Sequence, residues 1–398
     1  MPFVNQYFSH SHHARSAMSQ VQPLSICMLS DDFLPGATGV GTHLQAVAGH
    51  LSRRGHRISI ITSRRPGEPE QEVWRGVQVY RVPTLKLFGF YQALPSGAEI
   101  ERLLRKIRPD VVHHHYLGVM LLRALKVCKR LGLKQVYTYH MTEDHLTQPL
   151  PMRPFRRLIV RKIVSICNRV DLLISVSKNL AEQLPAKGIH TPVHFISNPV
   201  DFADPQSVEP MVREAGFVVM FAGRLNPEKN IPFLLRSFAL MLKRVTDAQL
   251  LIAGAGADLD ALQRQCVALG IQERVKFLGF LNHDLLARYY AACDVFVLPS
   301  WVETQGLVAM EAMWFAKPIV VARSVVSATE LVDEGVNGFL VEPENDQELA
   351  DRLVQLSADA GLRAALGAAG RRKSTQYEAE SVVDLMESSY REVAVTAN

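Results

Sequence analysis

Arg224 and Lys229 are two cations placed where a parallel sheet could present them to a ligand. They lie in the segment FAGRLNPEKN at 221–230, between a strand-like apolar run and a helix-like run that begins near Pro232. Loops that follow the strands of a parallel sheet lie at its ligand-binding edge. Arg can bind a phosphate through two hydrogen bonds, and the Lys ammonium acts as a point charge. The pair predicts a diphosphate site, with two solvated surface cations as the alternative.

Two carboxylates, Glu303 and Glu311, flank the start of another predicted helix. The segment PSWVETQGLVAME at 299–311 ends a strand and opens a helix near Gly306. The first amides of a helix have no partner within it, so those of Gly306, Leu307 and Val308 could receive an anion. Glu311 lies one turn deeper, where a carboxylate could accept the paired hydroxyls of a ribose. The segment therefore predicts a nucleotide site.

A glycine-rich loop follows the first predicted strand. The segment LSDDFLPGATGVG at 29–41 has glycines at 36, 39 and 41. Gly39 and Gly41 could let backbone amides approach a phosphate or a sugar at the start of a helix. The spacing matches neither the dinucleotide fingerprint nor the P-loop, so a plain glycine-rich turn is equally compatible with it.

Short apolar runs alternate with longer helix-period runs from Leu24 onward, which is typical of βαβ units and parallel sheets. A polar, Pro-containing stretch at 198–210 interrupts the alternation and predicts a boundary between two domains. We therefore expect an α/β protein with two Rossmann-like, doubly wound domains facing a central cleft. The expected strands are 25–29, 57–62, 77–81, 110–114, 135–139, 171–176, 193–196, 217–221, 249–253, 275–278, 295–298, 318–322 and 338–341, and the expected helices are 41–54, 97–107, 119–131, 154–167, 178–184, 232–244, 259–269, 283–291, 306–315 and 347–356.

Composition describes an ordinary globular protein. The 398 residues exceed what one hydrophobic core usually supports, and the mean hydropathy is +0.05. No apolar run approaches the ~20 residues that a membrane-spanning helix needs. The first 20 residues are rich in His and Ser and lack a continuous apolar stretch, so they predict a disordered tail rather than a secretory signal. Five widely spaced cysteines predict free thiols in a reducing cytoplasm, and a net charge of +5 gives no reason to expect a nucleic-acid partner.

These segments, in this order, resemble family 4 of the retaining glycosyltransferases. The resemblance runs from about Leu24 to the carboxyl terminus and implies the two-domain GT-B fold. It implies a tail at 1–20, an N-terminal acceptor-side domain at 21–200, a C-terminal domain at 201–373 that binds a nucleotide-sugar donor, and a helix at 374–398 that crosses back to the first domain. The common Glu-Gly-Phe-Gly form around the first Glu is here Glu303-Thr-Gln-Gly306. No role is therefore carried over to Gln305.

The resemblance also implies roles for single residues. Arg224 and Lys229 would hold the donor diphosphate, Glu311 would bind the ribose, and Glu303 would lie beside the transferred sugar. His140, in the segment YTYHMTEDH at 137–145, would orient the reacting sugar. No metal or other cofactor is required, because the cations and the helix amino terminus meet the charge on the leaving diphosphate.

The expected reaction is transfer of a hexose-type sugar from a nucleoside diphosphate to a lipid-linked or envelope saccharide. A soluble acceptor is the variant. A nucleotide-sugar 2-epimerase of the same fold and a catalytically silent nucleotide-sugar binding protein are the alternatives from other classes. The basic, partly apolar stretch at 153–162 could lie on an anionic membrane, or it could be an ordinary helix with one solvated cationic face.

Two patterns resemble metal sites and are interpreted otherwise. His113, His114 and His115 are consecutive on a predicted strand, so their side chains alternate between its faces and the triplet cannot close on one ion. Asp258 and Asp260 follow a glycine-rich loop at the start of a helix, where capping is the simpler account. We expect no metal site.

Overall fold

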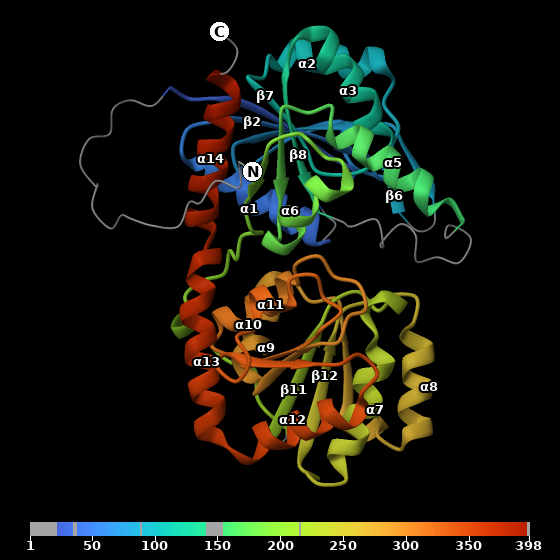
Figure 1. The fold of residues 1–398 in the computed structure, drawn as a ribbon, viewed down its shortest axis with the longest axis vertical. Coiled ribbons are helices and arrows are strands. Elements are labelled where there is room, and N and C mark those ends of the chain that lie inside the picture. Colours follow the sequence, from blue (N-terminus) through green and yellow to red (C-terminus); the bar gives the residue numbers. More distant parts are fainter. Residues whose placement is uncertain (1–21, 35–37, 88–89, 141–153, 215, 396–398) are drawn as a thin grey trace, which may run out of the picture. The chain divides into compact units, whose positions relative to one another are not determined.

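The computed structural model describes residues 22–34, 38–87, 90–140, 154–214 and 216–395. The chain divides into two compact α/β units (Figure 1). The first unit contains the described residues up to Pro199 together with those from Ala379 onward, and the second unit is Val200–Glu378. The predicted tail at 1–20 lies outside the described residues.

The first unit is built on a sheet in which β3 pairs antiparallel with β4 and the other neighbours pair in parallel. Chain order reverses at β1, which has β7 on one side and β2 on the other. Such a reversal opens a crevice at the carboxyl ends of the strands. In spatial order the strands are β10 (Val193–Phe195), β9 (Leu172–Ser175), β8 (Lys134–Tyr139), β7 (Val111–His114), β1 (Ser25–Ser30), β2 (Arg57–Ser63), β4 (Val77–Val82) and β3 (Gln71–Trp74).

Side-chain alternation along β1 divides the apolar residues between the two faces of this sheet. Ile26 and Met28 pack into one buried cluster, and Cys27 and Leu29 pack into another. Helices α1 and α14 cover the first face, and α2 and α3 cover the second. Among its described residues, the α-helices of this unit are α1 (Gly39–Arg53), α2 (Gly97–Ile107), α3 (Val119–Leu131), α5 (Arg156–Cys167), α6 (Lys178–Gln183) and α14 (Ala379–Val395).

Three strands of this unit were not predicted. The edge strand β3 alternates exposed and half-buried side chains and contains no fully buried residue. The hairpin of β5 (Thr84–Leu87) and β6 (Phe90–Ala93) forms a separate two-stranded sheet. Strands that bury little apolar surface leave a weak period-2 signal in the sequence.

Helix α14 belongs to the first unit, although it lies at the far end of the chain. Val382, Met386 and Tyr390 pack in the same cluster as Ile26 and Met28. The helix was expected to begin at residue 374, but it begins at Ala379. The preceding residues stay with the second unit, where the Tyr377 carbonyl accepts a hydrogen bond of 2.7 Å from the Val200 amide. The second unit consequently extends to Glu378 rather than to residue 373.

The second unit contains a fully parallel sheet with the same kind of reversal, here between β11 and β14. Every residue of β11 is buried, as expected for a strand covered on both faces. In spatial order the strands are β13 (Val275–Gly279), β12 (Ala248–Ala253), β11 (Phe217–Ala222), β14 (Val295–Leu298), β15 (Ile319–Ala322) and β16 (Gly338–Val341).

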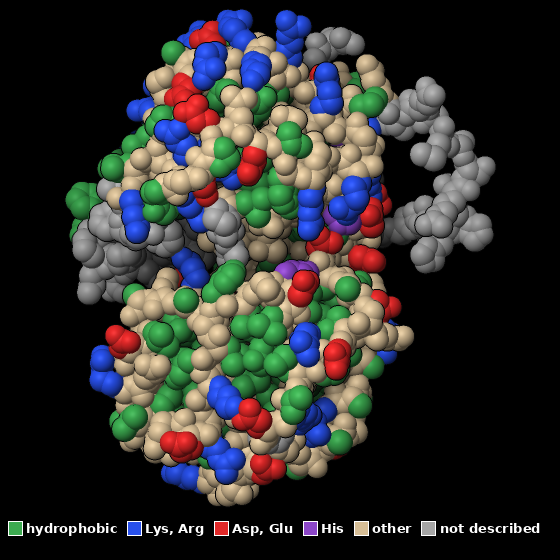
Figure 2. Space-filling model, turned by 180° about the vertical axis from the view of Figure 1, so that it is seen from behind, with side chains coloured by type: hydrophobic (Ala, Val, Ile, Leu, Met, Phe, Trp, Pro, Cys, Tyr) green, Lys and Arg blue, Asp and Glu red, His purple; other side chains and the backbone are tan. Residues whose placement is uncertain are grey.

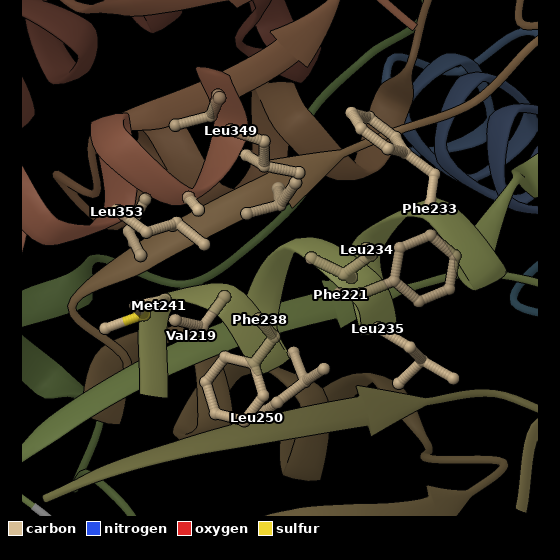
Figure 3. Close-up of a cluster of buried hydrophobic side chains, with 14 of the residues drawn as sticks. Val219, Phe221, Phe233, Leu234, Leu235, Phe238, Met241, Leu250, Leu349 and Leu353 are labelled. Atoms are coloured by element: carbon tan, nitrogen blue, oxygen red, sulfur yellow. The ribbon is translucent and has the colours of Figure 1, made fainter. Parts of the chain in front are cut away.

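The two faces of this sheet bury separate apolar clusters. Figure 3 shows the larger cluster, in which Phe233 and Phe238 of α7 lie near Val219 and Phe221 of β11, and Leu349 comes from α12. Alternate β11 residues point to the other face, which α9 and α10 cover. The helices are α7 (Ile231–Leu242), α8 (Leu259–Leu269), α9 (His283–Ala292), α10 (Leu307–Trp314), α11 (Ala328–Leu331), α12 (Asp346–Ala358) and α13 (Ala360–Ser374).

Helix α13 was not predicted, because its buried face is made largely of small residues. A Cβ atom added at Gly367 would lie 2.0 Å from the Ala316 carbonyl oxygen, and one added at Gly370 would lie 3.4 Å from Met313 Cγ. The helix therefore packs by close backbone approach, which leaves no period of large apolar residues to recognise.

On the face drawn in Figure 2, Lys and Arg side chains are interspersed with Asp and Glu, and no large region of one sign is visible there. All five cysteines are buried free thiols. None of the helices in the described ranges is long and apolar enough to cross a membrane.

Candidate active site

The predicted donor residues of the second unit lie on the loops after β11 and β14. These two strands are hydrogen-bonded neighbours, so their carboxyl ends lie side by side where the strand order reverses. Arg224 and Lys229 follow β11, and Glu303 follows β14. The fold thus brings together residues that are some 70 to 80 positions apart in the sequence (Lys229 and Glu303 are separated by 74).

Backbone contacts fix the loop that carries Arg224. The Gly223 amide donates to the Ala253 carbonyl at 2.9 Å, and the Leu225 amide donates to the Ala255 carbonyl at 3.0 Å. A Cβ atom at Gly256 would lie 2.2 Å from the Leu225 carbonyl oxygen, so this approach requires glycine. These hydrogen bonds hold the loop against the end of β12 and the residues that follow it, so Arg224 is presented at the carboxyl edge of the sheet.

The guanidinium of Arg224 lies at the surface beside a carboxylate that was not predicted. Its Nη2 atom is 3.1 Å from Glu228 Oε1, and 44% of its side chain is exposed. The Glu228 carbonyl also accepts a hydrogen bond of 2.9 Å from the Trp301 amide, which joins the loop after β11 to the loop after β14. The only sequence signal for Glu228 was its position within the same basic segment.

Lys229 and Glu303 form an ion pair in the site. Lys229 Nζ lies 2.5 Å from Glu303 Oε2, and the two side chains are only 14% and 20% exposed. Charges withdrawn from water in this way attract each other more strongly than surface charges do. The pair holds the ammonium of Lys229 in a defined position at the end of β14.

The amino end of α10 has a geometry that only glycine fits well. Gly306 has φ of +75°, and an added Cβ atom would lie 2.6 Å from Leu298 Cδ2. Its carbonyl accepts hydrogen bonds from later residues of the helix, whereas the amides of Leu307 and Val308 belong to the first turn. Both of these residues are half-buried. The positive end of the helix dipole therefore lies directly after the Glu303 loop.

Glu311 is a buried acid with a partner that was not predicted. The residue is 5% exposed, and Tyr290 Oη of α9 donates a hydrogen bond of 2.8 Å to its Oε2 atom. Burial raises the pKa of Glu311 to about 7, and the hydrogen bond from Tyr290 opposes part of that rise. Among the predicted donor residues, the structure thus joins Lys229 to Glu303 and places Glu311 against Tyr290.

In the first unit, an acid organises the loop before α1. Thr38 caps the helix by accepting a hydrogen bond of 3.3 Å from the Gly41 amide, and Asp32 accepts one from the Thr38 hydroxyl. Arg65 Nη2 lies 3.0 Å from the other Asp32 oxygen. Gly39 is exposed, with no atom near the position of an added Cβ. The sequence analysis did not single out Asp32, although an acidic residue just after a strand is a usable signal for a site at the sheet edge. Gly36 of the predicted loop lies outside the described residues.

His140 follows β8 and contacts other histidines. Its Nε2 atom is 3.2 Å from Nδ1 of His115, which follows the neighbouring strand β7. Burial keeps the pKa of His140 well below its ordinary range, and the nearby His43 lowers it further. The residues that follow it in the predicted motif, 141–145, lie outside the described residues.

The structure agrees with the prediction for the histidine triplet at 113–115 and differs from the one for Asp258. His114 points away from its neighbours, with Nε2 3.2 Å from Gln135 Oε1, as strand alternation predicts. The capping role of Asp258 is wrong, because its side chain makes no capping hydrogen bond to α8. Its amide instead donates to the Leu225 carbonyl at 3.0 Å, and burial together with the charge of Glu228 raises the pKa of its carboxyl group.

Known protein families, relatives and solved structures match most of this chain. Residues 37–204 match the model of glycosyltransferase family 4, and residues 206–373 match the model of glycosyl transferases group 1. An uncharacterized glycosyltransferase of Methanocaldococcus jannaschii is 31% identical over 85% of this chain and 90% of its own. A GDP-mannose-dependent α-(1-6)-phosphatidylinositol monomannoside mannosyltransferase of Mycolicibacterium smegmatis is 28% identical over 86% and 92%. The crystal structure of HepE from Anabaena with UDP-glucose has a TM-score of 0.74 at 21% identity and covers 93% of this chain and 100% of its own.

The two Rossmann-like units and their structural neighbours define a protein of the GT-B fold class, as the sequence predicted. The chain belongs to glycosyltransferase family 4 and is a glycosyltransferase.

Proposed function

We propose that this enzyme transfers a hexose-type sugar, with retention of configuration, from a nucleoside diphosphate to a lipid-linked or envelope saccharide. The observation that carries the proposal is the ion pair between Lys229 and Glu303 beside the amino end of α10, where the strand order of the second unit reverses; Arg224 lies on the same loop as Lys229. That edge of a parallel sheet is where nucleotides bind.

The proposed chemistry follows from charge. Departure of the nucleoside diphosphate builds negative charge on phosphate oxygens. Arg224 and Lys229 would meet this charge, together with the first amides of α10 at Leu307 and Val308. Because these groups supply the positive charge, the donor site is proposed to work without a metal ion.

Glu303 would have two tasks in this scheme. Its ion pair holds the Lys229 ammonium in place before the donor binds. When the donor binds, its diphosphate would pair with the Lys229 ammonium in place of Glu303. The Glu303 carboxylate could then accept hydrogen bonds from hydroxyls of the transferred sugar. Glu311 would accept hydrogen bonds from the ribose hydroxyls after its carboxyl group loses its proton or the hydrogen bond from Tyr290.

Retention places the acceptor on the same face of the sugar as the leaving group. The acceptor hydroxyl would attack as the sugar departs, and the diphosphate would take the proton. His140 is assigned no proton transfer and is proposed to orient the sugar. Its depressed pKa keeps the imidazole neutral at neutral pH, so it can donate one hydrogen bond and accept another.

The acceptor class is supported by relatives and by α5. The name of the Mycolicibacterium relative specifies a phosphatidylinositol monomannoside. In this chain, Phe155 and Leu158 at the start of α5 are 55% and 65% exposed and stand beside the exposed cations Arg157, Arg161 and Lys162. Apolar side chains next to cations suit an anionic membrane surface. A cytoplasmic enzyme that touches the membrane through this helix is therefore proposed; Arg153 of the predicted stretch lies outside the described residues.

Donor binding and release of the nucleoside diphosphate test the function. We expect Arg224→Ala and Lys229→Ala to weaken binding of nucleoside diphosphates by about tenfold or more each, the loss of one charge-assisted contact. His140→Ala should bind the donor normally and lose turnover. Binding is measured by calorimetry across a panel of nucleoside diphosphates and their sugars.

Arg244→Ala is the matched control, because Arg244 pairs with Asp351 on the exposed surface of the same unit. Unchanged binding and turnover in the Arg224 and Lys229 variants would remove the proposal. Release of nucleoside diphosphate that needs an acceptor favours transfer, whereas release or epimerisation without one favours the epimerase alternative.

Flotation with lipid vesicles tests the proposed membrane contact. The protein should float with vesicles that contain anionic lipid and should remain unbound with neutral vesicles. Leu158→Ser combined with Arg161→Ser should reduce flotation several-fold, because each basic residue near an anionic surface contributes about 1 kcal/mol. Equal flotation of the double variant and the unaltered protein would contradict a role for α5.

A further inference from the structure

Four histidines from three parts of the first unit gather at the carboxyl ends of β7 and β8. His43 lies on α1, His113 and His115 lie in or directly after β7, and His140 lies directly after β8. The ring of His43 is centred 5.3 Å from that of His115 and 4.9 Å from that of His140. Side-chain alternation explains the grouping, because residues 113 and 115 share one face of the strand and residue 114 points to the other.

The ring nitrogens of this cluster are only partly satisfied by protein groups. His113 is fully bonded, with Nδ1 2.6 Å from Tyr390 Oη and Nε2 2.7 Å from Thr138 Oγ1. His43 is completely buried and Asn198 hydrogen-bonds to its ring, which leaves at least one of the two His43 nitrogens without a partner among the described residues. Nε2 of the buried His115 also has none there, whereas its Nδ1 is the nitrogen that faces His140. Each such buried polar group costs about 1–3 kcal/mol, which favours an occupant that the protein itself does not supply.

The chemical state of the cluster suits a metal ion. Burial lowers the pKa of His43 to about 4 and holds those of His115 and His140 well below their ordinary range. The hydrogen bond between the Asn198 side chain and His43 raises the pKa of His43 and offsets only part of the effect of burial. The imidazoles are therefore neutral at neutral pH, and neutral imidazole is the form that binds metals.

We propose that His43, His115 and His140 form a binding site for a divalent transition metal such as Zn²⁺, with a fourth position open to water or a ligand. One ring nitrogen from each lies within 4.8 Å of those of the other two. Tetrahedral Zn²⁺ with bonds of about 2.0–2.1 Å needs nitrogens about 3.3 Å apart. Nδ1 of His115 and Nε2 of His140 are already 3.2 Å apart, so closure of the site requires a small inward movement of His43.

The site would have a consequence for catalysis that rests on the function proposed above. A metal ion on His140 occupies one of the two ring nitrogens of the residue that is proposed to orient the sugar. Zn²⁺ would then inhibit transfer without any effect on donor binding in the second unit. The binding of the metal itself does not depend on that assignment, so it is tested without an activity measurement.

Metal binding to the full-length chain tests the proposal. His10, His12 and His13 near the amino terminus could also bind metal, so all measurements use a background in which these three are replaced by Gln. The protein is stripped with a chelator, titrated with Co²⁺ and followed by visible d–d absorption. Its Zn²⁺ content after gel filtration is measured by mass spectrometry. We expect one metal per chain and an intense Co²⁺ band typical of tetrahedral coordination.

His43→Gln should weaken Zn²⁺ binding by about tenfold or more and abolish the tetrahedral Co²⁺ band, because it removes one of three ligands. His140→Gln, at a half-buried position, repeats the test if the first variant does not fold. His190→Gln, on the exposed surface, is the control and should bind as the background protein does. Absence of stoichiometric metal, or equal binding by the His43, His140 and His190 variants, would overturn the site and leave buried water as the partner of these rings.

Discussion

Glu311 is an ionisable residue in the core of the second unit, and its protonation couples stability to pH. Its ordinary pKa is 4.5, and burial raises it to about 7. The folded state therefore holds this proton more tightly than the unfolded state does. The contribution of Glu311 to stability is fully present below about pH 4.5 and is lost as the pH rises to about 7.

We expect Glu311→Gln to remove this loss, because the amide resembles the protonated acid and cannot ionise. The difference in unfolding free energy between variant and unaltered protein should be constant below pH 4.5. It should grow by an amount on the order of 3 kcal/mol in favour of the variant by pH 8. Thermal unfolding across this pH range measures it, with the exposed Glu273→Gln as the control. Parallel pH profiles for the Glu311 variant and the unaltered protein would show that Glu311 does not titrate in this range.

At the scale of elements, the conformation of Gly306 sets the start of α10. Gly306→Ala should cost about 1–2 kcal/mol from the left-handed backbone alone. The contact with Leu298 adds to that cost, since a Cβ atom would lie 2.6 Å from Leu298 Cδ2. We expect a lower melting temperature for the second unit and weaker donor binding, because the first amides of α10 shift.

Gly270→Ala is a closely matched control. Gly270 also has a positive φ, of +69°, but an added Cβ atom there would meet nothing within 4 Å. It should show the backbone cost without the displacement of α10, so donor binding should be retained. Equal effects of the two substitutions on donor binding would mean that the placement of α10 does not depend on Gly306.

At the scale of the whole molecule, α14 ties the end of the chain to the first unit. Arg54 at the end of α1 pairs with Glu380 at 2.5 Å and Asp384 at 2.7 Å on α14. The deepest polar contact is between Tyr390 Oη and His113 Nδ1, both fully buried. The exposed carboxylates are screened by water, so the buried contact should contribute more to the docking of the helix.

Tyr390→Phe should cost about 1–3 kcal/mol, because it leaves a buried ring nitrogen of His113 without its partner. The loss should appear as faster hydrogen exchange in α14, α1 and β7, which all belong to the first unit, and not in the second unit. Tyr289→Phe on α9 is the control for loss of a tyrosine hydroxyl in the other unit. Equal protection of α14 in the Tyr390 variant and the unaltered protein would show that apolar packing alone docks the helix.

The sequence by itself determined most of the local structure, and it supplied the prediction of most candidate donor residues. Strands covered on both faces appear in the sequence as short runs of large apolar residues. In amphipathic helices the apolar residues recur with the helical period, so both kinds of element can be predicted from the sequence alone. Arg224 with Lys229, and Glu303 with Glu311, were recognisable because each pair lies on one loop or on one loop and the helix it opens. The strands β3, β5 and β6 and the helix α13 lacked such a signal, because they bury little apolar surface or pack through glycine.

Only the tertiary structure decided which of these residues meet. Lys229 pairs with Glu303, Glu311 with Tyr290, and His113 with Tyr390 across 277 positions, because parallel strands bring distant loops to one edge of a sheet. The histidines show the same limit: alternation correctly separated His114 from its neighbours, but it did not reveal that His43 and His140 would meet His115. Sequence spacing describes neighbours along one element, whereas a site assembled from several elements depends on their packing.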